Sequence, residues 1–323
     1  MVLSIDARDG RGSSEYREVM PLTGRNVMVV AGATGSGFNL VKRLHKLGAY
    51  VIPTTRNIEH FTKNVEPVLG NERVFPLVFD ITSESQIDGA LKTLKDRDLG
   101  ITDCVISAAG GMESFSGNMG LALARIHRKV SVDDRPAELE KLLEDIRGWV
   151  NESRKAAMAV NYHGPRYLVH RLTNLLPRGG ILVFDSSWWS SLYRSEIQVP
   201  PFYNAVAASK NLFEQELASR TPDLKSRGIL TAVITGNLLI DTTIGKYFEK
   251  YLIPLLHEEE RVKLKPFPTM SDMTKATEQL FRSDPACWPE VPRYLWVAGP
   301  GVILDSPPLE DAILKANFFQ KLN

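Results

Sequence analysis

Asn26-Val-Met-Val-Val-Ala31 is a short apolar run, and the glycine-rich stretch Gly32-Ala-Thr-Gly-Ser-Gly37 follows it directly. An apolar run of this kind is typical of a parallel strand that is buried on both faces. Residues 38–47 then repeat apolar side chains at helical spacing, and Gly48 ends that pattern. The order of strand, glycine turn and helix predicts the first half of a βαβ unit.

Further apolar runs of strand length alternate with helical segments along the chain. The expected strands cover residues 49–54, 73–79, 102–107, 180–185, 229–234 and 294–298. Crossovers between such strands are right-handed, so each strand is expected to lie parallel to its neighbour. The sequence therefore predicts an α/β fold, a single doubly wound parallel sheet (Rossmann-like) with helices on both faces.

The composition is that of an ordinary globular protein, with 43% hydrophobic and 24% charged residues in a chain of 323. Lys and Arg number 39 against 38 Asp and Glu, so the formal net charge of +1 argues against nucleic-acid and membrane partners. Two cysteines do not make a disulfide framework and fit a reducing compartment. Because the chain has no apolar run of membrane-spanning length and starts with polar residues, we expect a cytoplasmic protein.

The chain is expected to form one main domain. Residues 1–24 are polar and carry several glycines and serines, which indicates a loosely ordered N-terminal arm. Residues 25–323 show no linker-like break and are expected to form the sheet domain. Two stretches are longer than the crossovers require: an insert near 110–150 and a segment near 240–268.

The glycine-rich turn is expected to bind a dinucleotide. Glycine lets the backbone approach a pyrophosphate, and the free N–H groups of the following helix favour the anion. The expected contacts come from Gly32, Thr34, Gly35, Ser36 and Gly37.

The end of the second expected strand indicates which dinucleotide binds. An acidic side chain there accepts hydrogen bonds from ribose hydroxyls, whereas a basic one accommodates a 2′-phosphate. Residues 53–57 read Pro-Thr-Thr-Arg-Asn, with Arg56 and without a carboxylate. This composition favours NADP(H) over NAD(H).

From about residue 22 to residue 300 the sequence resembles the short-chain dehydrogenase/reductase superfamily. The resemblance rests on the order and spacing of Asp80, Ser107-Ala-Ala-Gly110, Val160-Asn-Tyr-His-Gly164, Ser186-Ser187, Ala208-Ser-Lys210, Thr235-Gly-Asn237 and Asp241-Thr242. Two features depart from the family pattern. Both asparagines of its Asn-Asn-Ala-Gly segment are replaced, and the glycine turn is shorter than the common one.

The resemblance implies roles for these residues. The cofactor would contact Asp80 at the adenine, Ala108, Ala109 and Gly110 beneath it, and Thr235, Gly236 and Thr242 at the nicotinamide. Asn161 would support a proton-relay water, and Lys210 would hold the ribose and lower the pKa of a catalytic tyrosine. Ser186 or Ser187 would orient the substrate oxygen, and residue counts do not separate the two. Asp185, directly before them, is expected to cap a turn.

The tyrosine spacing is unusual for this family. Most members carry a tyrosine four residues before the lysine, but this chain has Val206 there, and its nearest tyrosine is Tyr203, seven residues before Lys210. At about 100° per residue, both spacings return to the same helix face, with Tyr203 roughly 5 Å further along the axis. Such a displaced hydroxyl suits a substrate oxygen that is remote from the hydride-accepting carbon, as in a conjugated enone or enoyl thioester. The spacing is similar to that of enoyl-thioester reductases, whereas Ala208-Ser-Lys210 looks more like the ketoreductase branch.

The sequence therefore predicts an NADP(H)-dependent oxidoreductase that transfers hydride to a conjugated enone, an enoyl compound or a ketone, with double-bond reduction favoured. Tyr203 would be the general acid, and Tyr193, Trp188 and Tyr203 would contact the substrate, although core packing explains Tyr193 and Trp188 equally well. Residues near 240–268 would form a substrate lid. We expect a small-molecule or carrier-bound substrate and a homo-oligomer; the histidines and cysteines show no metal-ligand spacing, so no metal is expected.

Two alternatives stay open. The first is a ketoreductase that lacks a tyrosine general acid, and the second is a non-catalytic NADP(H) sensor.

Overall fold

The computed structural model describes residues 22–107, 155–186, 190, 204–236, 269–284, 286, 288–289, 292–299 and 302–304, with isolated positions between 131 and 141. The expected N-terminal arm and the segment near 240–268 lie outside these residues, as does nearly all of the insert near 110–150. Within the described part of the chain, no helix is both long enough and apolar enough to span a membrane.

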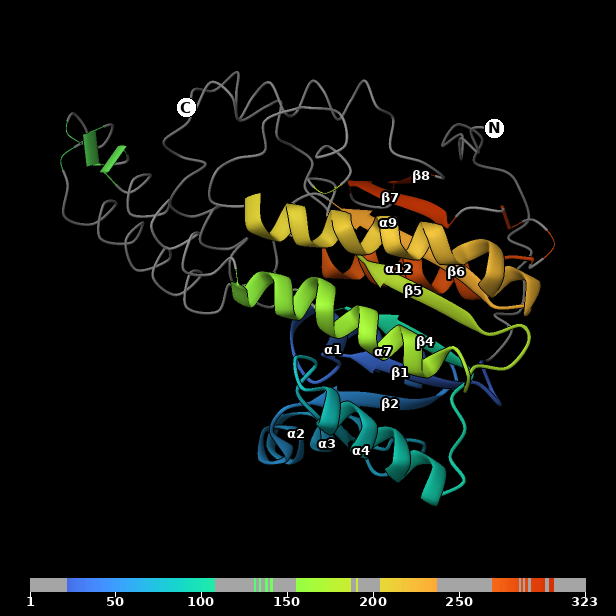
Figure 1. The fold of residues 1–323 in the computed structure, drawn as a ribbon. Helices are drawn as coiled ribbons and strands as arrows, with labels where there is room; N and C mark the ends of the chain where they lie inside the picture. The colour runs from blue at the N-terminus through green and yellow to red at the C-terminus, as the bar shows by residue number, and fades with distance from the viewer. Residues whose placement is uncertain are drawn as a thin grey trace, which may run out of the picture.

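One sheet organises the described residues, with strand order β3-β2-β1-β4-β5-β6-β7-β8 (Figure 1). The strands are β1 (Asn26–Val30), β2 (Tyr50–Thr55), β3 (Leu77–Val78), β4 (Asp103–Ile106), β5 (Ile181–Asp185), β6 (Leu230–Gly236), β7 (Arg293–Gly299) and β8 (Val302–Leu304). Neighbours from β3 to β7 pair in parallel, whereas β8 pairs antiparallel with β7. The predicted doubly wound sheet is confirmed, with β8 as an unexpected antiparallel edge strand.

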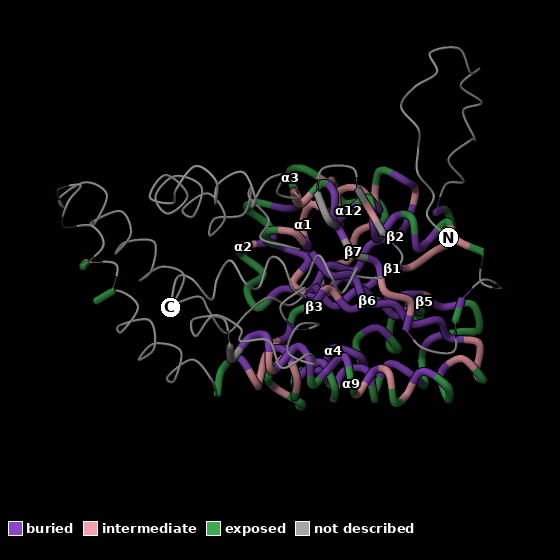
Figure 2. The backbone as a smooth tube through the Cα atoms, turned by 90° about the horizontal axis from the view of Figure 1, so that it is seen from above, coloured by how far each residue is buried: buried purple, intermediate pink, exposed green. Residues whose placement is uncertain are grey.

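Helices cover both faces of this sheet. One face carries α1 (Gly35–Lys46) and α12 (Met270–Arg282), and the other carries α4 (Glu84–Asp96), α7 (Gly164–Leu172) and α9 (Asn204–Ser226). A π-helical turn, η1 (Ala159–His163), leads into α7, and two short helices, α2 (Ile58–Asn64) and α3 (Glu66–Leu69), follow β2. Figure 2 shows the buried strands as a layer between the two helical layers.

Alternating side chains along the strands explain this layering. In β1, Val27 and Val29 belong to the apolar cluster beneath α1 and α12, while Met28 and Val30 belong to the cluster beneath α4, α7 and α9. Successive side chains of a strand point to opposite faces, so a run without polar residues is buried on both.

Two element boundaries differ from the expected ones. The third strand is reduced to β3, although Val74 makes an isolated parallel bridge with Val51. Pro76 lies between these two pairings and has no N–H to continue the ladder. The first helix begins earlier than its apolar pattern indicates, at Gly35, which places two glycines of the turn inside its first turn.

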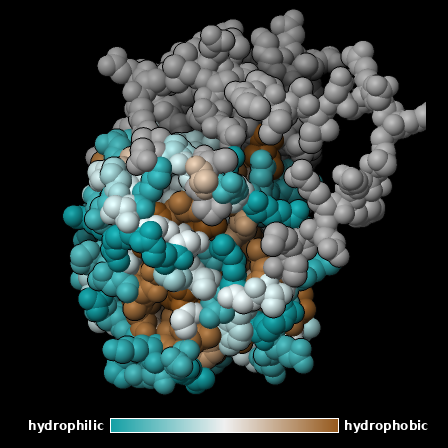
Figure 3. Space-filling model, turned by 90° about the vertical axis from the view of Figure 1, so that its right-hand side faces the viewer, coloured by the Kyte–Doolittle hydropathy of each residue, from teal (hydrophilic) through white to brown (hydrophobic). Residues whose placement is uncertain are grey.

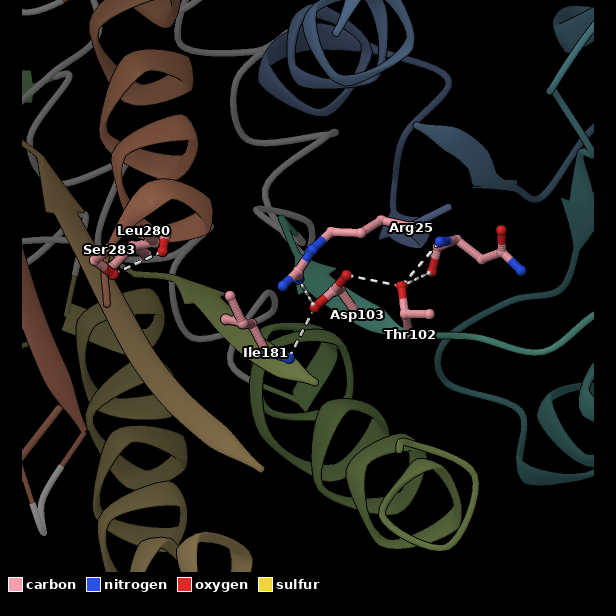
Figure 4. Close-up of polar contacts among 7 residues, drawn as sticks. Arg25, Thr102, Asp103, Ile181, Leu280 and Ser283 are labelled. Atoms are coloured by element: carbon pink, nitrogen blue, oxygen red, sulfur yellow. Dashed lines mark hydrogen bonds and ion pairs between the residues drawn. The ribbon is translucent and has the colours of Figure 1, made fainter. Parts of the chain in front are cut away.

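A buried carboxylate joins the ends at which β1, β4 and β5 begin (Figure 4). Asp103 accepts hydrogen bonds from Arg25 Nη1 at 2.6 Å, from Thr102 Oγ1 at 2.8 Å and from the Ile181 backbone N–H at 2.9 Å. Figure 3 views the molecule from this end of the strands, where apolar side chains show between hydrophilic ones. Asp103 thus fixes the strand ends that lie opposite the candidate site.

Candidate active site

The glycine-rich turn joins β1 to α1 through a close backbone approach. Ala31 has a left-handed conformation (φ 58°), and its N–H donates to Thr54 Oγ1 at 3.0 Å. A Cβ at Gly32 would lie 2.7 Å from a carbonyl oxygen of β1, and a Cβ at Gly37 would lie 2.4 Å from the Ala31 carbonyl oxygen. Both distances are below van der Waals contact, so this turn requires glycine at both positions.

Among the described residues, none caps or covers the N-terminus of α1. The α2, α4 and α12 helices begin with side-chain caps from Asn57, Ser83 and Thr269, whereas the Thr34 side chain makes no capping bond to α1. The first turn of α1 carries no acidic residue, and a Cβ on Gly35 (φ +53°) would meet no described atom within 4 Å. Uncapped N–H groups beside open space fit a pyrophosphate.

Arg56 lies exposed directly after β2, the strand that pairs with β1. The Thr55 hydroxyl donates to the Asn57 carbonyl oxygen at 2.9 Å, and Asn57 in turn caps α2. The turn that carries Arg56 is therefore fixed on both sides. Its position at the carboxyl end of β2 is the one at which a 2′-phosphate is expected.

Asp80 shapes the loop between β3 and α4. Its Oδ1 accepts hydrogen bonds from the Thr82 backbone N–H at 2.8 Å and from Thr82 Oγ1 at 2.7 Å. A Cβ at Gly164, the first residue of α7, would lie 2.2 Å from the Ile81 carbonyl oxygen. The loop thus packs closely against the helix that follows Asn161.

A line of polar groups crosses the carboxyl ends of the central strands. Ser36 Oγ lies 3.3 Å from Ser107 Oγ, and Ser107 Oγ donates to Asp185 Oδ2 at 2.9 Å. Lys210 Nζ, on α9, donates to the Asp185 backbone carbonyl oxygen at 3.1 Å, and Lys210 is only 3% exposed. Because β1, β4 and β5 are neighbours in the sheet, this line joins the glycine turn to the lysine of α9.

Asp185 accepts a hydrogen bond from the neighbouring strand. Its partner there is Ser107, and residues 187–189 of the turn that it was expected to cap lie outside the described part of the chain. Loss of solvent raises the pKa of this partly buried carboxyl, and the charge of Lys210 and the hydrogen bond from Ser107 oppose that rise. The register of β4 with β5, in which Ile106 pairs with Phe184, places Ser107 beside Asp185.

This raised pKa predicts a pH-dependent contribution to stability. Between the unfolded pKa of about 3.9 and the raised folded pKa, the native state binds more protons, so the free energy of unfolding falls as pH rises. The variant Asp185→Asn lacks this titration. Urea denaturation of both proteins from about pH 4 to about pH 8 should show the wild type losing stability relative to the variant. A constant difference across this range would contradict the prediction.

Asn161 lies in the π-helical turn η1 and is fully buried. Its Nδ2 donates to Ser209 Oγ at 3.3 Å, and Ser209 Oγ donates to the Val206 carbonyl oxygen at 3.0 Å. The turn therefore contacts the helix that carries Lys210; π-helical turns are frequent at functional sites. Val206, at the position of the family tyrosine, is itself buried at 3% exposure.

Ser186 turns its hydroxyl into the protein. It donates to Glu214 Oε1 of α9 at 2.5 Å, and its oxygen lies 2.9 Å from Ser190 Oγ. Sequence reasoning missed Glu214. The available signal was its position four residues after Lys210, which places both side chains on one helix face.

Thr235 and Gly236 end β6 beside the line of polar groups. Thr235 is fully buried, and its Oγ1 has no hydrogen-bond partner among the described residues. Buried hydroxyls are normally paired, so this one fits a polar group of a ligand. A Cβ at Gly236 would lie 2.8 Å from Met273 Sδ, so close packing against α12 accounts for this glycine.

The remaining predicted site residues lie outside the described part of the chain: Ala108, Ala109, Gly110, Ser187, Trp188, Tyr193, Tyr203 and Thr242. Tyr203 directly precedes Asn204, the first residue of α9. Within the described ranges, no group of three or more His, Cys, Asp or Glu side chains is placed to hold a metal ion.

Residues 25–133 match the family described as short chain dehydrogenase. Over 162 residues the chain is 25% identical to "Oxidoreductase BOA17" of Botryotinia fuckeliana (strain B05.10), covering 50% of this chain and 54% of that protein, about half its length. The fold is similar to a dehydrogenase/reductase from Sinorhizobium meliloti 1021, with a TM-score of 0.59, 18% identity and coverage of 88% and 97%. It is also similar to 3-ketoacyl-(acyl-carrier-protein) reductase from Brucella melitensis complexed with NADH, with a TM-score of 0.61, 14% identity and coverage of 86% and 98%.

Proposed function

The chain belongs to the short-chain dehydrogenase/reductase superfamily of nicotinamide-dependent oxidoreductases, and on that premise we propose that it is an NADP(H)-dependent reductase. Its proposed substrate is a conjugated enone, an enoyl compound or a ketone, either free or bound to a carrier. One observation carries the proposal: the buried Lys210 ammonium group lies at the end of β5, in line with the open N-terminus of α1. That arrangement supports a dinucleotide and a proton-transferring group side by side.

The described residues suit the parts of this cofactor. The N-terminus of α1 at Thr34, Gly35 and Ser36 would hold the pyrophosphate, and Arg56 would hold the 2′-phosphate. The unpaired Thr235 hydroxyl would bind a polar group of the nicotinamide. When bound, the cofactor supplies the hydride.

The chain's own residues would handle the proton. We assign Tyr203 as the donor to the substrate oxygen, with the Lys210 charge favouring release of the phenol proton. Because the Ser186 hydroxyl is bound to Glu214, we assign the orientation of the substrate oxygen to Ser187. Asn161, in contact with α9 through Ser209, would support the relay that returns the proton.

Double-bond reduction is the proposal's preferred chemistry. The family's usual tyrosine position holds Val206, which is buried and has no proton to donate. A donor seven residues before the lysine would lie one helical turn further from it, roughly 5 Å along the axis. This spacing suits a carbonyl oxygen separated from the hydride-accepting carbon by conjugated bonds.

The test is the consumption of NADPH and NADH with panels of ketones, conjugated enones and enoyl thioesters. We expect NADPH to be consumed, with the enones or thioesters reduced fastest. In Arg56→Ala, the preference for NADPH over NADH should fall by about tenfold or more, because the variant loses one charged hydrogen bond to the 2′-phosphate.

Arg178→Ala is the matched control, since this exposed arginine lies between α7 and β5, at the opposite ends of the strands. It should leave the preference unchanged. If NADPH binds but no substrate is turned over, the protein is a non-catalytic sensor and the proposal is wrong. If the wild type uses NADPH and NADH equally well, Arg56 does not select for the 2′-phosphate.

A further inference from the structure

A buried cluster beside the active site contains a carboxylate that the proposed chemistry does not use. Glu214 of α9 is fully buried, and its Oε1 accepts hydrogen bonds from the hydroxyls of Ser186 and Ser190. The two serine oxygens lie 2.9 Å apart. One carboxylate oxygen therefore holds both ends of the segment 186–190.

A second side chain of the same helix holds this segment. Asn211 Nδ2 donates to the Ser190 carbonyl oxygen at 2.7 Å, and the Asn211 side chain accepts from Gln215 Nε2 at 2.5 Å. Asn211 is 3% exposed and Ser190 is fully buried. The far end of the segment is thus fixed to α9 through both its hydroxyl and its backbone.

The near end is fixed to the sheet as well as to α9. The Ser186 backbone N–H donates to the Ile234 carbonyl oxygen of β6 at 2.8 Å, while its hydroxyl donates to Glu214. Directly before it, the Asp185 carbonyl oxygen accepts from Lys210 Nζ. The lysine and Glu214 are four residues apart on α9, so one helix face holds consecutive residues of the β5 end.

We propose that Glu214 is a positioning residue, whose carboxylate holds Ser186 and Ser190 against the helix face that carries Lys210. Burial of an acidic side chain is costly unless strong hydrogen bonds satisfy it, and both serine hydroxyls supply them. The positions of Ser186 and Ser190 relative to Lys210 then depend on Glu214. For catalysis this inference rests on the proposed function; for the segment's structure it does not.

The experiment measures hydrogen–deuterium exchange and turnover in the full-length protein. In Glu214→Ala, amides in peptides covering residues 181–190 should exchange about tenfold faster or more, because the variant loses two hydrogen bonds that oppose local opening. Peptides from α1 should be unchanged. kcat should fall by about tenfold, with KM for NADPH unchanged.

Three further variants sharpen the result. Glu214→Gln keeps an oxygen acceptor for both serines and should restore slow exchange and most of kcat. Ser190→Ala removes one of the two hydroxyls and should give an intermediate increase, which tests the same bond if Glu214→Ala does not fold. Glu216→Gln is the control on the same helix; its carboxylate pairs with Arg166 and Arg220, away from the cluster, and it should behave as the wild type.

Unchanged exchange at residues 181–190 in both Glu214→Ala and Ser190→Ala would overturn the proposal. Uniformly faster exchange along the chain would also overturn it, because Glu214 would then contribute to general stability alone. If the wild type turns over no substrate, the proposed function fails, while the exchange measurements still decide whether Glu214 positions the segment.

Discussion

Tyr203→Phe is expected to lower kcat by about 10²-fold or more, the usual contribution of a general acid. The variant removes the phenolic hydroxyl alone and keeps the ring, so any packing role of Tyr203 is retained. Val206, at the family's usual tyrosine position, is buried and offers no replacement proton. KM for NADPH should stay unchanged, since the lost interaction acts in the transition state. Steady-state kinetics with the best substrate from the cofactor-consumption panel measures both parameters.

Tyr167→Phe is the matched control for this substitution. The Tyr167 hydroxyl donates to Asp88 at 2.8 Å, which joins α7 to α4 away from the line of polar groups. It should leave kcat within about twofold of the wild type, since small surface changes rarely exceed 0.5 kcal/mol. A Tyr203→Phe variant as active as this control would show that water or the substrate itself supplies the proton, as in a reductase without a tyrosine acid.

The fold was largely predictable because its strands are buried on both faces. Runs such as residues 26–31 need no tertiary information to be recognised, and the helical segments between them leave few alternatives to a doubly wound sheet. The exceptions have local causes. Pro76 shortens the third strand to β3, and the three residues of β8 are too few to show a periodic pattern.

Residues of the candidate site were predictable where the chemistry of a single residue is enough to indicate its role. Gly32 and Gly37 are required by close backbone approach, and Lys210 carries a charge into a buried position. The partners of Ser186 and Asp185 were not predictable. Those contacts depend on how β5 registers with β4 and how α9 crosses it, and such tertiary placement leaves no periodic trace in the sequence.

Asp103→Ala is expected to lower the free energy of unfolding by about 3 kcal/mol. Asp103 is fully buried and accepts three hydrogen bonds, so the variant leaves the Ile181 N–H without an acceptor and Arg25 without its counter-charge (Figure 4). The Arg25 side chain is 30% exposed, so water replaces part of its lost partner and keeps the effect at the lower end of the range for broken buried pairs. Urea denaturation measures the change.

Two further variants show how much of the stability loss comes from the buried position of Asp103 and how much from its charge. Asp103→Asn keeps an oxygen acceptor for the Ile181 N–H, puts an NH2 group opposite the Thr102 hydroxyl and loses the charge, so it should cost about half as much. Asp96→Ala removes an exposed carboxylate that pairs with Lys92 on α4, and it should cost no more than about 0.5 kcal/mol. An Asp103→Ala protein as stable as Asp96→Ala would mean that the strand ends are held by apolar packing without this carboxylate. Because Asp103 lies at the opposite ends of the strands from Lys210, the folded variant should keep wild-type kcat, which distinguishes a stabilising residue from the groups that act on the substrate.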